Sequence, residues 1–203
     1  MTEAATLTAR GSRTRQRIVA TAAELVHAHG LAATTNEQVR SAAGVSGSQL
    51  GHYFADKAAL VSAVLEFQDE RVLDHEQTAW AGLDSVARLR AWRDSLVASQ
   101  QAGGCCGGCP IGSLGAALAE SDEQSRQRVA RVFDRWRSII AGGLSSLREH
   151  GGLPADVDTD GLAGAVLASL QGGLLLSQVS RDVRPLADAL DAALNHIEAL
   201  GRH

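Results

Sequence analysis

Apolar residues recur every three or four positions along most of the chain, and glycines or capping residues separate these runs. In the run that begins at Arg15, Gly30 follows as a C-terminal cap, and the apolar residues are Ile18, Val19, Ala22, Leu25 and Val26. This spacing places the apolar side chains on one face of an α-helix, whereas a half-buried strand needs strict alternation. The aromatic fraction is only 3%, and alanine and leucine, both strong helix formers, are abundant. We therefore expect an all-α protein of about nine helices.

Three helices are expected in the first 57 residues, and the last two of them are short. Thr34 to Glu37 has the pattern of a capping box, and the helix that follows ends near Ala43, where Gly44 interrupts it. Ser46 with Gln49 caps the next helix, which runs to about Tyr53, and Asp56 caps a longer one. Two short helices joined by a turn that contains glycine are typical of a helix–turn–helix, whose second helix enters the major groove of DNA.

The side chains of this helix pair divide into an apolar seam and a polar face. Ala42, Val45 and Leu50 form the expected contact between the two helices. The polar residues left on the outer face are Ser46, Ser48, Gln49 and His52. Hydroxyl and amide groups bond both base edges and phosphates, so this face suits DNA recognition. On spacing alone, a plain helical hairpin with a solvated polar face remains the alternative.

The distribution of charge is compatible with DNA binding by the first part of the chain. Residues 1–57 carry six basic and four acidic side chains, although the whole chain has a net charge of -4. The chain therefore combines a slightly positive N-terminal part with an acidic remainder, which we expect to begin a second domain at residue 58.

A specific motif runs through residues 35–60. It consists of Thr35, Val39, Ala42-Ala43-Gly44-Val45-Ser46, Leu50, His52-Tyr53-Phe54, Asp56-Lys57 and Leu60. This motif closely resembles the DNA-binding head of the TetR/AcrR family of transcriptional regulators. Two positions depart from the family pattern, because Gly51 stands where an aromatic residue is usual and Gly47 where lysine is common.

The resemblance implies roles for individual residues of the head, residues 1–57. Lys57 is implied to contact a DNA phosphate, and Arg13 and Arg15 to form a basic arm before the first helix. The side chains implied to face DNA are Thr35, Ser46, Ser48, Gln49, His52 and Tyr53. The implied partner is double-stranded operator DNA.

Residues 58–203 are expected to form a larger helical body. Pro110 suits the first turn of a helix, and Ser121 with Gln124 caps another that runs to about His150. The last two helices are expected at about 158–177 and 186–200, separated by Arg184-Pro185. Because the former has a small-residue side and an apolar side, we expect both sides to be buried, the outer one by a second copy in a two-fold four-helix bundle. A helix buried entirely within its own chain is the alternative.

Three short segments of this body resemble the C-terminal domain of the LmrA/YxaF-like branch of the same family. They are Cys109-Pro110-Ile111-Gly112-Ser113-Leu114, Gln171-Gly172-Gly173-Leu174-Leu175-Leu176 and Arg184-Pro185-Leu186. The resemblance implies effector binding and dimerisation by this domain. Pockets of this kind lie between helices and are mostly apolar. The lining that we expect is Trp92, Leu114, Leu118, Phe133, Trp136 and Gln171. A simple core role is the alternative for the aromatic residues.

The three cysteines of the chain, Cys105, Cys106 and Cys109, allow several interpretations. Cys106 and Cys109 form one ligand pair, whereas a zinc site needs four ligands, so we expect no metal. Cys109 directly precedes Pro110 at a helix N-terminus, where the helix dipole lowers the pKa of a thiol. A repressor that senses oxidants or electrophiles through these thiols is therefore the alternative function. Packing in a glycine-rich turn is the remaining interpretation.

Several classes of protein are not expected. A membrane span needs about 18–20 apolar residues, and the longest candidate, Leu162 to Leu176, is shorter. The N-terminus shows no apolar leader, so we expect a soluble, cytoplasmic protein. We find no phosphate-binding loop and no nucleophile–base pair, so we expect neither an enzyme nor a cofactor. The expected function is a homodimeric repressor that binds a pseudo-palindromic operator and is released by a small apolar or aromatic effector.

Overall fold

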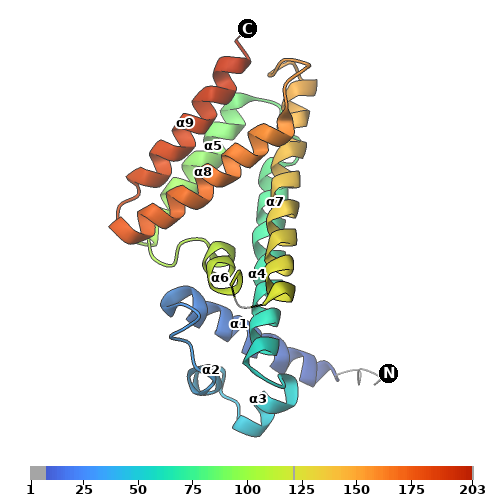
Figure 1. Ribbon diagram of the computed structural model, residues 1–203, viewed down its shortest axis with the longest axis vertical. Coiled ribbons are helices and arrows are strands. Elements are labelled where there is room, and N and C mark those ends of the chain that lie inside the picture. The colour runs from blue at the N-terminus through green and yellow to red at the C-terminus, as the bar shows by residue number, and fades with distance from the viewer. Residues whose placement is uncertain (1–7, 121, 203) are drawn as a thin grey trace. The chain divides into compact units, whose positions relative to one another are not determined.

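The structure is a computed structural model that describes residues 8–120 and 122–202. Within those residues it contains nine α-helices and no strand, which confirms the predicted all-α fold (Figure 1). The helices are α1 (Ala9–His29), α2 (Asn36–Ala43), α3 (Gly47–Tyr53), α4 (Lys57–Trp80), α5 (Val86–Ala102), α6 (Pro110–Leu118), α7 (Glu123–Glu149), α8 (Thr159–Ser180) and α9 (Arg184–Leu200).

The chain divides into two compact units, and the division falls inside α4. The first unit ends at Gln68 and the second begins at Asp69, so α4 contributes residues to both. The predicted domain boundary lies eleven residues earlier, after residue 57 at the first turn of α4, and it stays a prediction.

Most helix ends of the first unit follow local sequence signals. Gly30 and Gly44 have positive φ angles of 82° and 62° after α1 and α2, as expected of glycine caps. Ser46 and Gln49 form the predicted capping box of α3. Two predictions were wrong: α1 begins at Ala9, and the capping box of α2 joins Thr35 to Gln38, one residue later than expected.

The seam between α2 and α3 also differs from the prediction by one residue. Val45 and Leu50 are buried as expected, but Ala43 is buried in place of Ala42, which is exposed. One residue rotates a helix by about 100°, so neighbouring alanines point in different directions. Thr34 is buried as well, and its hydroxyl donates to the Gly30 carbonyl at 2.9 Å instead of capping a helix.

In the second unit α8 and α9 pack along one another, while α7 contacts α8 and α5 contacts α9 (Figure 1). The core between them contains leucines that are at most 1% exposed, such as Leu144 of α7, Leu170 of α8 and Leu190 of α9. Each such side chain contributes about 1.5–3 kcal/mol by leaving water. A Cβ at Gly173 would lie 2.8 Å from the Leu186 Cα, so this glycine permits the close contact of α8 with α9.

Three predicted helix ends of the second unit need correction. The N-cap of α7 is Asp122, which accepts from the Ser125 N–H at 2.9 Å, and the predicted cap Ser121 lies outside the described residues. Helix α8 continues to Ser180. Helix α9 begins at Arg184, so Arg184 and Pro185 form its first turn rather than a linker, in keeping with the preference for proline at that position.

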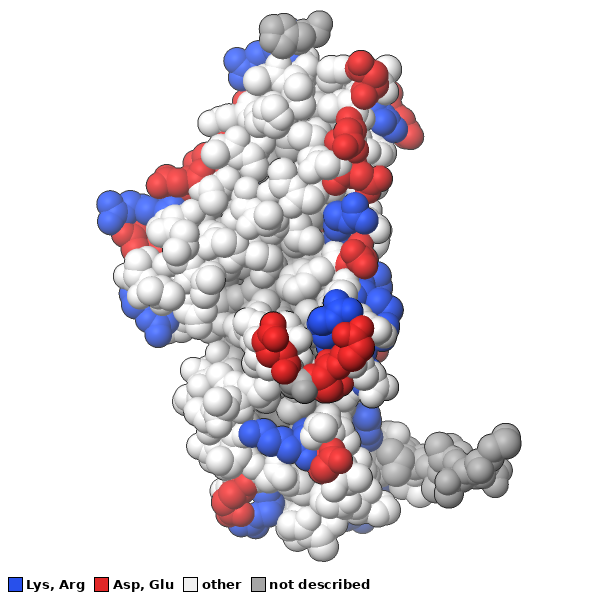
Figure 2. Space-filling view, in the orientation of Figure 1, with Lys and Arg blue, Asp and Glu red and all other residues white. Residues whose placement is uncertain are grey.

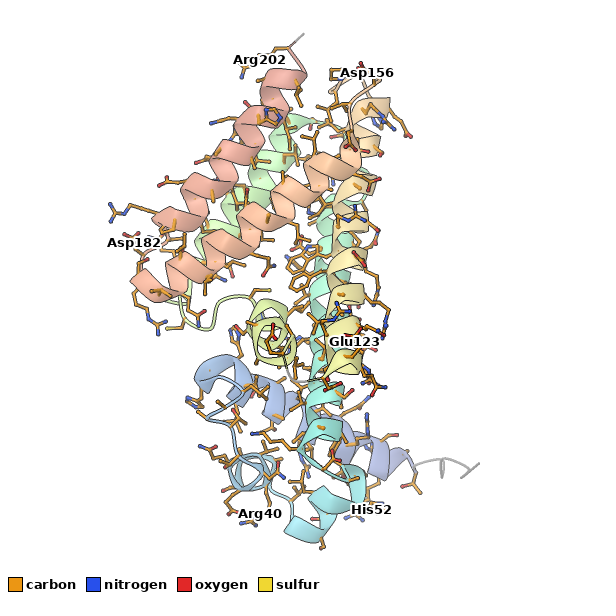
Figure 3. All side chains as sticks on the ribbon, in the orientation of Figure 1. Arg40, His52, Glu123, Asp156, Asp182 and Arg202 are labelled. Carbon is orange, nitrogen blue, oxygen red and sulfur yellow. The ribbon has the colours of Figure 1, made fainter. Side chains whose placement is uncertain are left out.

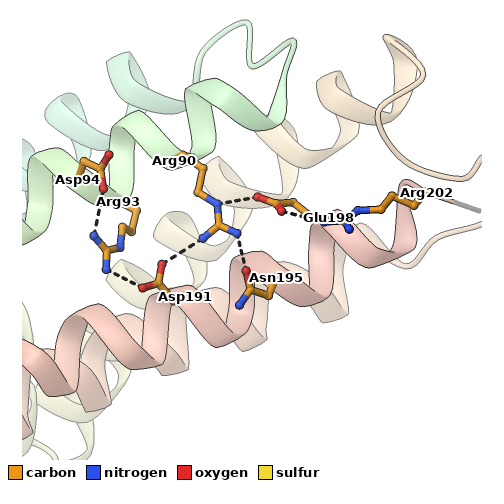
Figure 4. A network of polar contacts seen from close by, with 7 residues as sticks. All are labelled: Arg90, Arg93, Asp94, Asp191, Asn195, Glu198 and Arg202. Carbon is orange, nitrogen blue, oxygen red and sulfur yellow. Dashed lines mark hydrogen bonds and ion pairs between the residues drawn. The ribbon is translucent and has the colours of Figure 1, made fainter.

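Two arginines of α5 hold α9 through a network of ion pairs (Figure 4). Arg90 donates to Asp191 at 3.0 Å, to Asn195 at 2.6 Å and to Glu198 at 2.6 Å. Arg93 donates to the second oxygen of Asp191 at 2.7 Å. Because the guanidinium of Arg90 is shared by three partners on one helix, this network fixes α5 against α9.

Candidate DNA-binding surface and effector pocket

The candidate DNA-binding surface lies on α3, at the end of the first unit where Figure 3 labels Arg40 and His52. Ser46, Ser48, Gln49 and His52 are all exposed, as predicted for a recognition face. The Ser46 hydroxyl accepts from the Gln49 N–H at 3.1 Å, and the Gln49 Oε1 accepts from the Ser46 N–H at 2.9 Å. Gln49 therefore stabilises α3 with its carbonyl oxygen and presents its Nε2 group as a donor.

The residues around α3 are held by local contacts. The rings of His52 and Tyr53 meet edge to face at 5.1 Å between centroids. Thr35 caps α2, and the Lys57 Nζ donates to the Leu31 carbonyl at 3.4 Å while the side chain remains exposed. These contacts orient the four side chains without burying them completely.

Arg13 and Arg15 do not precede the first helix, because α1 already begins at Ala9. Arg13 is exposed on α1, whereas Arg15 is half-buried with its guanidinium 5.3 Å from the centre of the Phe54 ring. Such a cation–π contact stabilises the head. The basic arm predicted before the helix is thus part of the helix itself.

Arg40 is a cation near this surface to which the sequence analysis gave no role. It lies in the last turn of α2 and forms an ion pair with Glu37, one turn earlier on the same helix. The hydrogen bond from Arg40 lowers the pKa of Glu37. A basic residue in the last turn of the helix before the turn is a signal that could have marked it as a candidate phosphate contact.

The outer face of α8 is apolar and exposed. The exposed large hydrophobic residues of the described chain are Leu175 (59%), Leu176 (58%) and Val179 (76%), all on this helix. Ala165, Ala168 and Gly172 continue the same stripe and are exposed too, and Figure 2 shows a broad uncharged area over α8. The two apolar sides inferred for this helix are therefore an inner one in the core and an outer one facing solvent.

Helix α8 extends beyond the apolar stretch that the sequence predicted. Helix α8 spans 22 residues, and its most apolar stretch of 18 residues has a mean hydropathy of 1.5, so by length and composition alone it could cross a membrane. The sequence estimate stopped at Leu176, whereas the helix continues for another turn. The inner side of α8 packs in the core of its own unit, so its hydropathy needs no lipid to explain it.

The candidate effector pocket is a cavity of about 320 Å³ between α6, α7 and α8 of the second unit. Its lining residues are Cys109, Gly112, Ser113, Ala116, Phe133, Gln171, Gly172, Leu175 and Gln178. Of the expected residues, Phe133 and Gln171 lie at this cavity. The other four, Trp92, Leu114, Leu118 and Trp136, are buried in the packing and are not among its lining residues. Trp136 stacks on Phe133 with 6.5 Å between ring centroids, so it supports one wall.

Both units match known protein families. Residues 18–64 match the family model described as bacterial regulatory proteins, tetR family. Residues 85–193, more than half of the chain, match the model described as tetracyclin repressor-like, C-terminal domain. The chain belongs to the TetR family.

Relatives of this TetR-family chain are transcriptional regulators by name. An uncharacterized HTH-type transcriptional regulator of Mycobacterium tuberculosis is 29% identical over 85% of this chain and 88% of its own length. YxaF of Bacillus subtilis, an uncharacterized HTH-type transcriptional regulator, is 24% identical over 89% and 92%. The crystal structure of a TetR transcriptional regulator from Chloroflexus aurantiacus has a TM-score of 0.80 at 26% identity, covering 94% of this chain and 96% of that one. This chain is accordingly a transcriptional regulator with a helix–turn–helix head.

In this TetR-family chain the pKa of the Cys109 thiol differs from the prediction. The three thiols form no disulfide; Cys105 and Cys109 are buried and Cys106 is exposed. The Cys109 sulfur caps α6 by accepting from the Gly112 N–H at 3.3 Å. Burial nevertheless raises the pKa of this thiol and outweighs the lowering by backbone N–H groups at the helix terminus, so the predicted low pKa was wrong. Among the described residues no group of three or more His, Cys, Asp or Glu side chains could hold a metal ion.

A buried carboxyl group in the second unit was missed by the sequence analysis. Glu76 of α4 is 2% exposed, and its Oε2 accepts from the indole N–H groups of Trp80 at 3.1 Å and Trp92 at 3.2 Å. Burial raises the pKa of Glu76, and the hydrogen bonds from Trp92 and Trp80 oppose that rise. The signal was available, because Leu73, Glu76 and Trp80 follow the spacing of an inward helical stripe.

Proposed function

We propose that this protein is a ligand-responsive repressor that binds a pseudo-palindromic operator as a homodimer and is released by a small apolar effector. The observation that carries the proposal is that one chain combines an exposed polar recognition helix with an apolar cavity in a separate unit. A regulator needs both a surface for DNA and a second, distinct site whose occupancy alters the first.

The DNA contacts proposed for the head are of two kinds. Ser48, Gln49 and His52 on α3 contact base edges, and Thr35, Ser46 and Tyr53 help to position that helix. Lys57 and Arg13 contact phosphates, so the affinity falls steeply with salt, and each phosphate neutralised contributes about 0.9 to the logarithmic slope. Two heads of a dimer occupy successive major grooves about 34–36 Å apart.

The dimer interface is proposed on α8 and α9. The exposed stripe of α8, which ends with Leu175, Leu176 and Val179, provides the apolar face that a second copy would bury. Gly172 and Leu175 also line the cavity, so the same second copy would cover its open side. Binding of the effector is thereby linked to the interface. Because its partner is operator DNA, the protein works in the cytoplasm.

Release from DNA requires that the effector binds the conformation without DNA more tightly. A coupling free energy of about 1–3 kcal/mol between the two sites is usual, which corresponds to about 5–150-fold in affinity. Trp92, Leu114, Leu118 and Trp136 support the cavity walls in this proposal, and Phe133 and Gln171 contact the effector.

The test is fluorescence anisotropy of the protein with DNA flanking its own gene, compared with a scrambled duplex, at about 0.15 M salt. We expect tight, sequence-dependent binding with two protomers per site. His52→Ala should weaken the operator complex and reduce its preference over the scrambled duplex, whereas Ser99→Ala on the exposed face of α5 should not. Equal and weak binding to every fragment in a genome-wide selection would refute the proposal.

A further inference from the structure

We infer that the cavity between α6, α7 and α8 selects an uncharged, two-ring molecule whose hydrogen-bond acceptor meets the side-chain amide of Gln171. This inference rests on the proposed function, because it specifies the effector for the proposed site. Three properties of the cavity carry it: the charge of its lining, its unpaired polar group and its size.

The lining excludes a charged ligand. None of the nine residues that line the cavity carries a charged side chain, so a bound ion would lose its water without meeting a counter-charge. Phe133 and Leu175 offer only apolar surface.

Among the polar groups of the lining, one buried donor has no partner. The Ser113 hydroxyl donates to the Gly107 carbonyl at 3.2 Å, and the Cys109 sulfur already accepts from Gly112. The Nε2 of Gln171 is buried and has no hydrogen-bond partner, although the Gln171 amide lies near enough to Cys109 to lower the pKa of that thiol. A buried donor without a partner is costly, so a ligand that carries an acceptor gains free energy there.

Gly112 fixes the position of this amide. A Cβ at residue 112 would lie 2.6 Å from the Gln171 Oε1, so glycine is what allows the side chain to lie flat against α6. The carbonyl oxygen of Gln171 therefore faces the helix backbone. Its amino group has no partner and is itself buried, so a ligand acceptor reaches it when this half-buried side chain turns toward the cavity.

The volume sets the size of the ligand. An apolar cavity of about 150 Å³ holds one benzene molecule, and this one has about 320 Å³. Two fused rings with a short substituent are a suitable match. The Phe133 ring, itself stacked on Trp136, provides a flat wall for such a molecule.

The experiment measures binding of four naphthalene derivatives to the full-length protein by titration calorimetry, alone and in the operator complex. The probes are 2-acetylnaphthalene, 2-ethylnaphthalene, 2-naphthoate and 2-naphthylmethylammonium. We expect the acetyl compound to bind about 10-fold more tightly than the ethyl compound, which has no acceptor. Both ions should bind at least about 100-fold more weakly than the acetyl compound.

Variants locate the selectivity. In Gln171→Leu, 2-acetylnaphthalene and 2-ethylnaphthalene should bind with about equal affinity, because the substitution removes the Gln171 donor. Gly112→Ala should also reduce the preference for 2-acetylnaphthalene, because the added methyl group displaces the Gln171 amide. This second variant replaces Gln171→Leu in the test if Gln171→Leu folds poorly. The matched control, Gln124→Leu on the exposed surface of α7, should keep the preference.

The outcomes separate this inference from the proposed function. Tighter binding of either ion, or a preference that survives in Gln171→Leu, would overturn the inference and leave the repressor intact. No binding of any probe to a protein that still binds its operator would overturn it too. Selective binding of the acetyl compound without release of DNA would uphold the inference and contradict the effector role.

Discussion

Replacing Glu76 by glutamine tests whether burial of this carboxyl group makes stability depend on pH. The side chain is 2% exposed, and a single oxygen accepts from Trp80 and Trp92. Glutamine has nearly the same volume, and its Oε1 can accept both indole hydrogen bonds. The change therefore removes the titrating proton without opening a cavity or leaving an indole unpaired.

The sign of the effect follows from the raised pKa. Burial raises the pKa of Glu76 above its ordinary value of 4.5, so the folded chain binds this proton more tightly than the unfolded chain. The free energy of unfolding therefore falls as the pH rises from the unfolded pKa to the folded pKa, with a slope of at most about 1.4 kcal/mol per pH unit. The glutamine variant lacks this contribution, so its stability relative to the parent should increase with pH across that window.

Urea unfolding at fixed protein concentration, at about pH 5, 6, 7 and 8, measures the difference. Far-UV circular dichroism is the signal, because the tryptophans are part of the perturbed cluster. Glu76→Leu is the contrast, since it leaves two buried indole N–H groups unpaired at a cost of about 1–3 kcal/mol each. A difference between Glu76→Gln and the parent that does not change with pH would refute the reasoning.

Four further predictions concern substitutions of single residues. Val179→Asp puts a charge on the exposed face of α8 and should shift the protein to monomers in sedimentation velocity, whereas Ala130→Asp on the exposed side of α7 should not. Arg90→Ala removes three partners on α9 and should lower the free energy of unfolding by about 1–3 kcal/mol in urea titrations. Lys57→Ala should reduce the slope of operator affinity against salt by about 1. Cys106→Ser should leave operator affinity and its regulation unchanged in anisotropy titrations, and lost regulation would instead support thiol sensing.

The features predicted correctly from sequence are those fixed by neighbouring residues. The glycine cap at Gly44, the capping box of Ser46 with Gln49, and proline at the start of α6 each depend on a few consecutive positions. The errors at α1 and α2 concern where a helix starts, because Thr8 and Thr35 compete with equally suitable residues nearby.

The interior of the second unit could not be predicted in this way. Trp92 and Trp136 were expected on inward stripes, and both are buried, but only packing of α4, α5 and α7 brings them to Glu76. The pKa of Cys109 could not be predicted from its neighbouring residues either. Its predicted place before α6 is confirmed, yet burial raises its pKa by more than the backbone N–H groups at the helix terminus lower it. A helical pattern predicts which side of a helix is buried, but it does not predict which groups of other helices meet that side.

Helix α8 connects the features on which the proposed function depends. Within three turns it supplies Leu170 to the core, Gln171 to the cavity, and Val179 to the exposed face. Gly173 meets the backbone of Leu186 on α9, and a close-packed contact of that kind does not deform gradually. A ligand that displaces Gln171 or Gly172 must therefore move α8 and α9 together. In a dimer formed through these helices, the same displacement would change the interface.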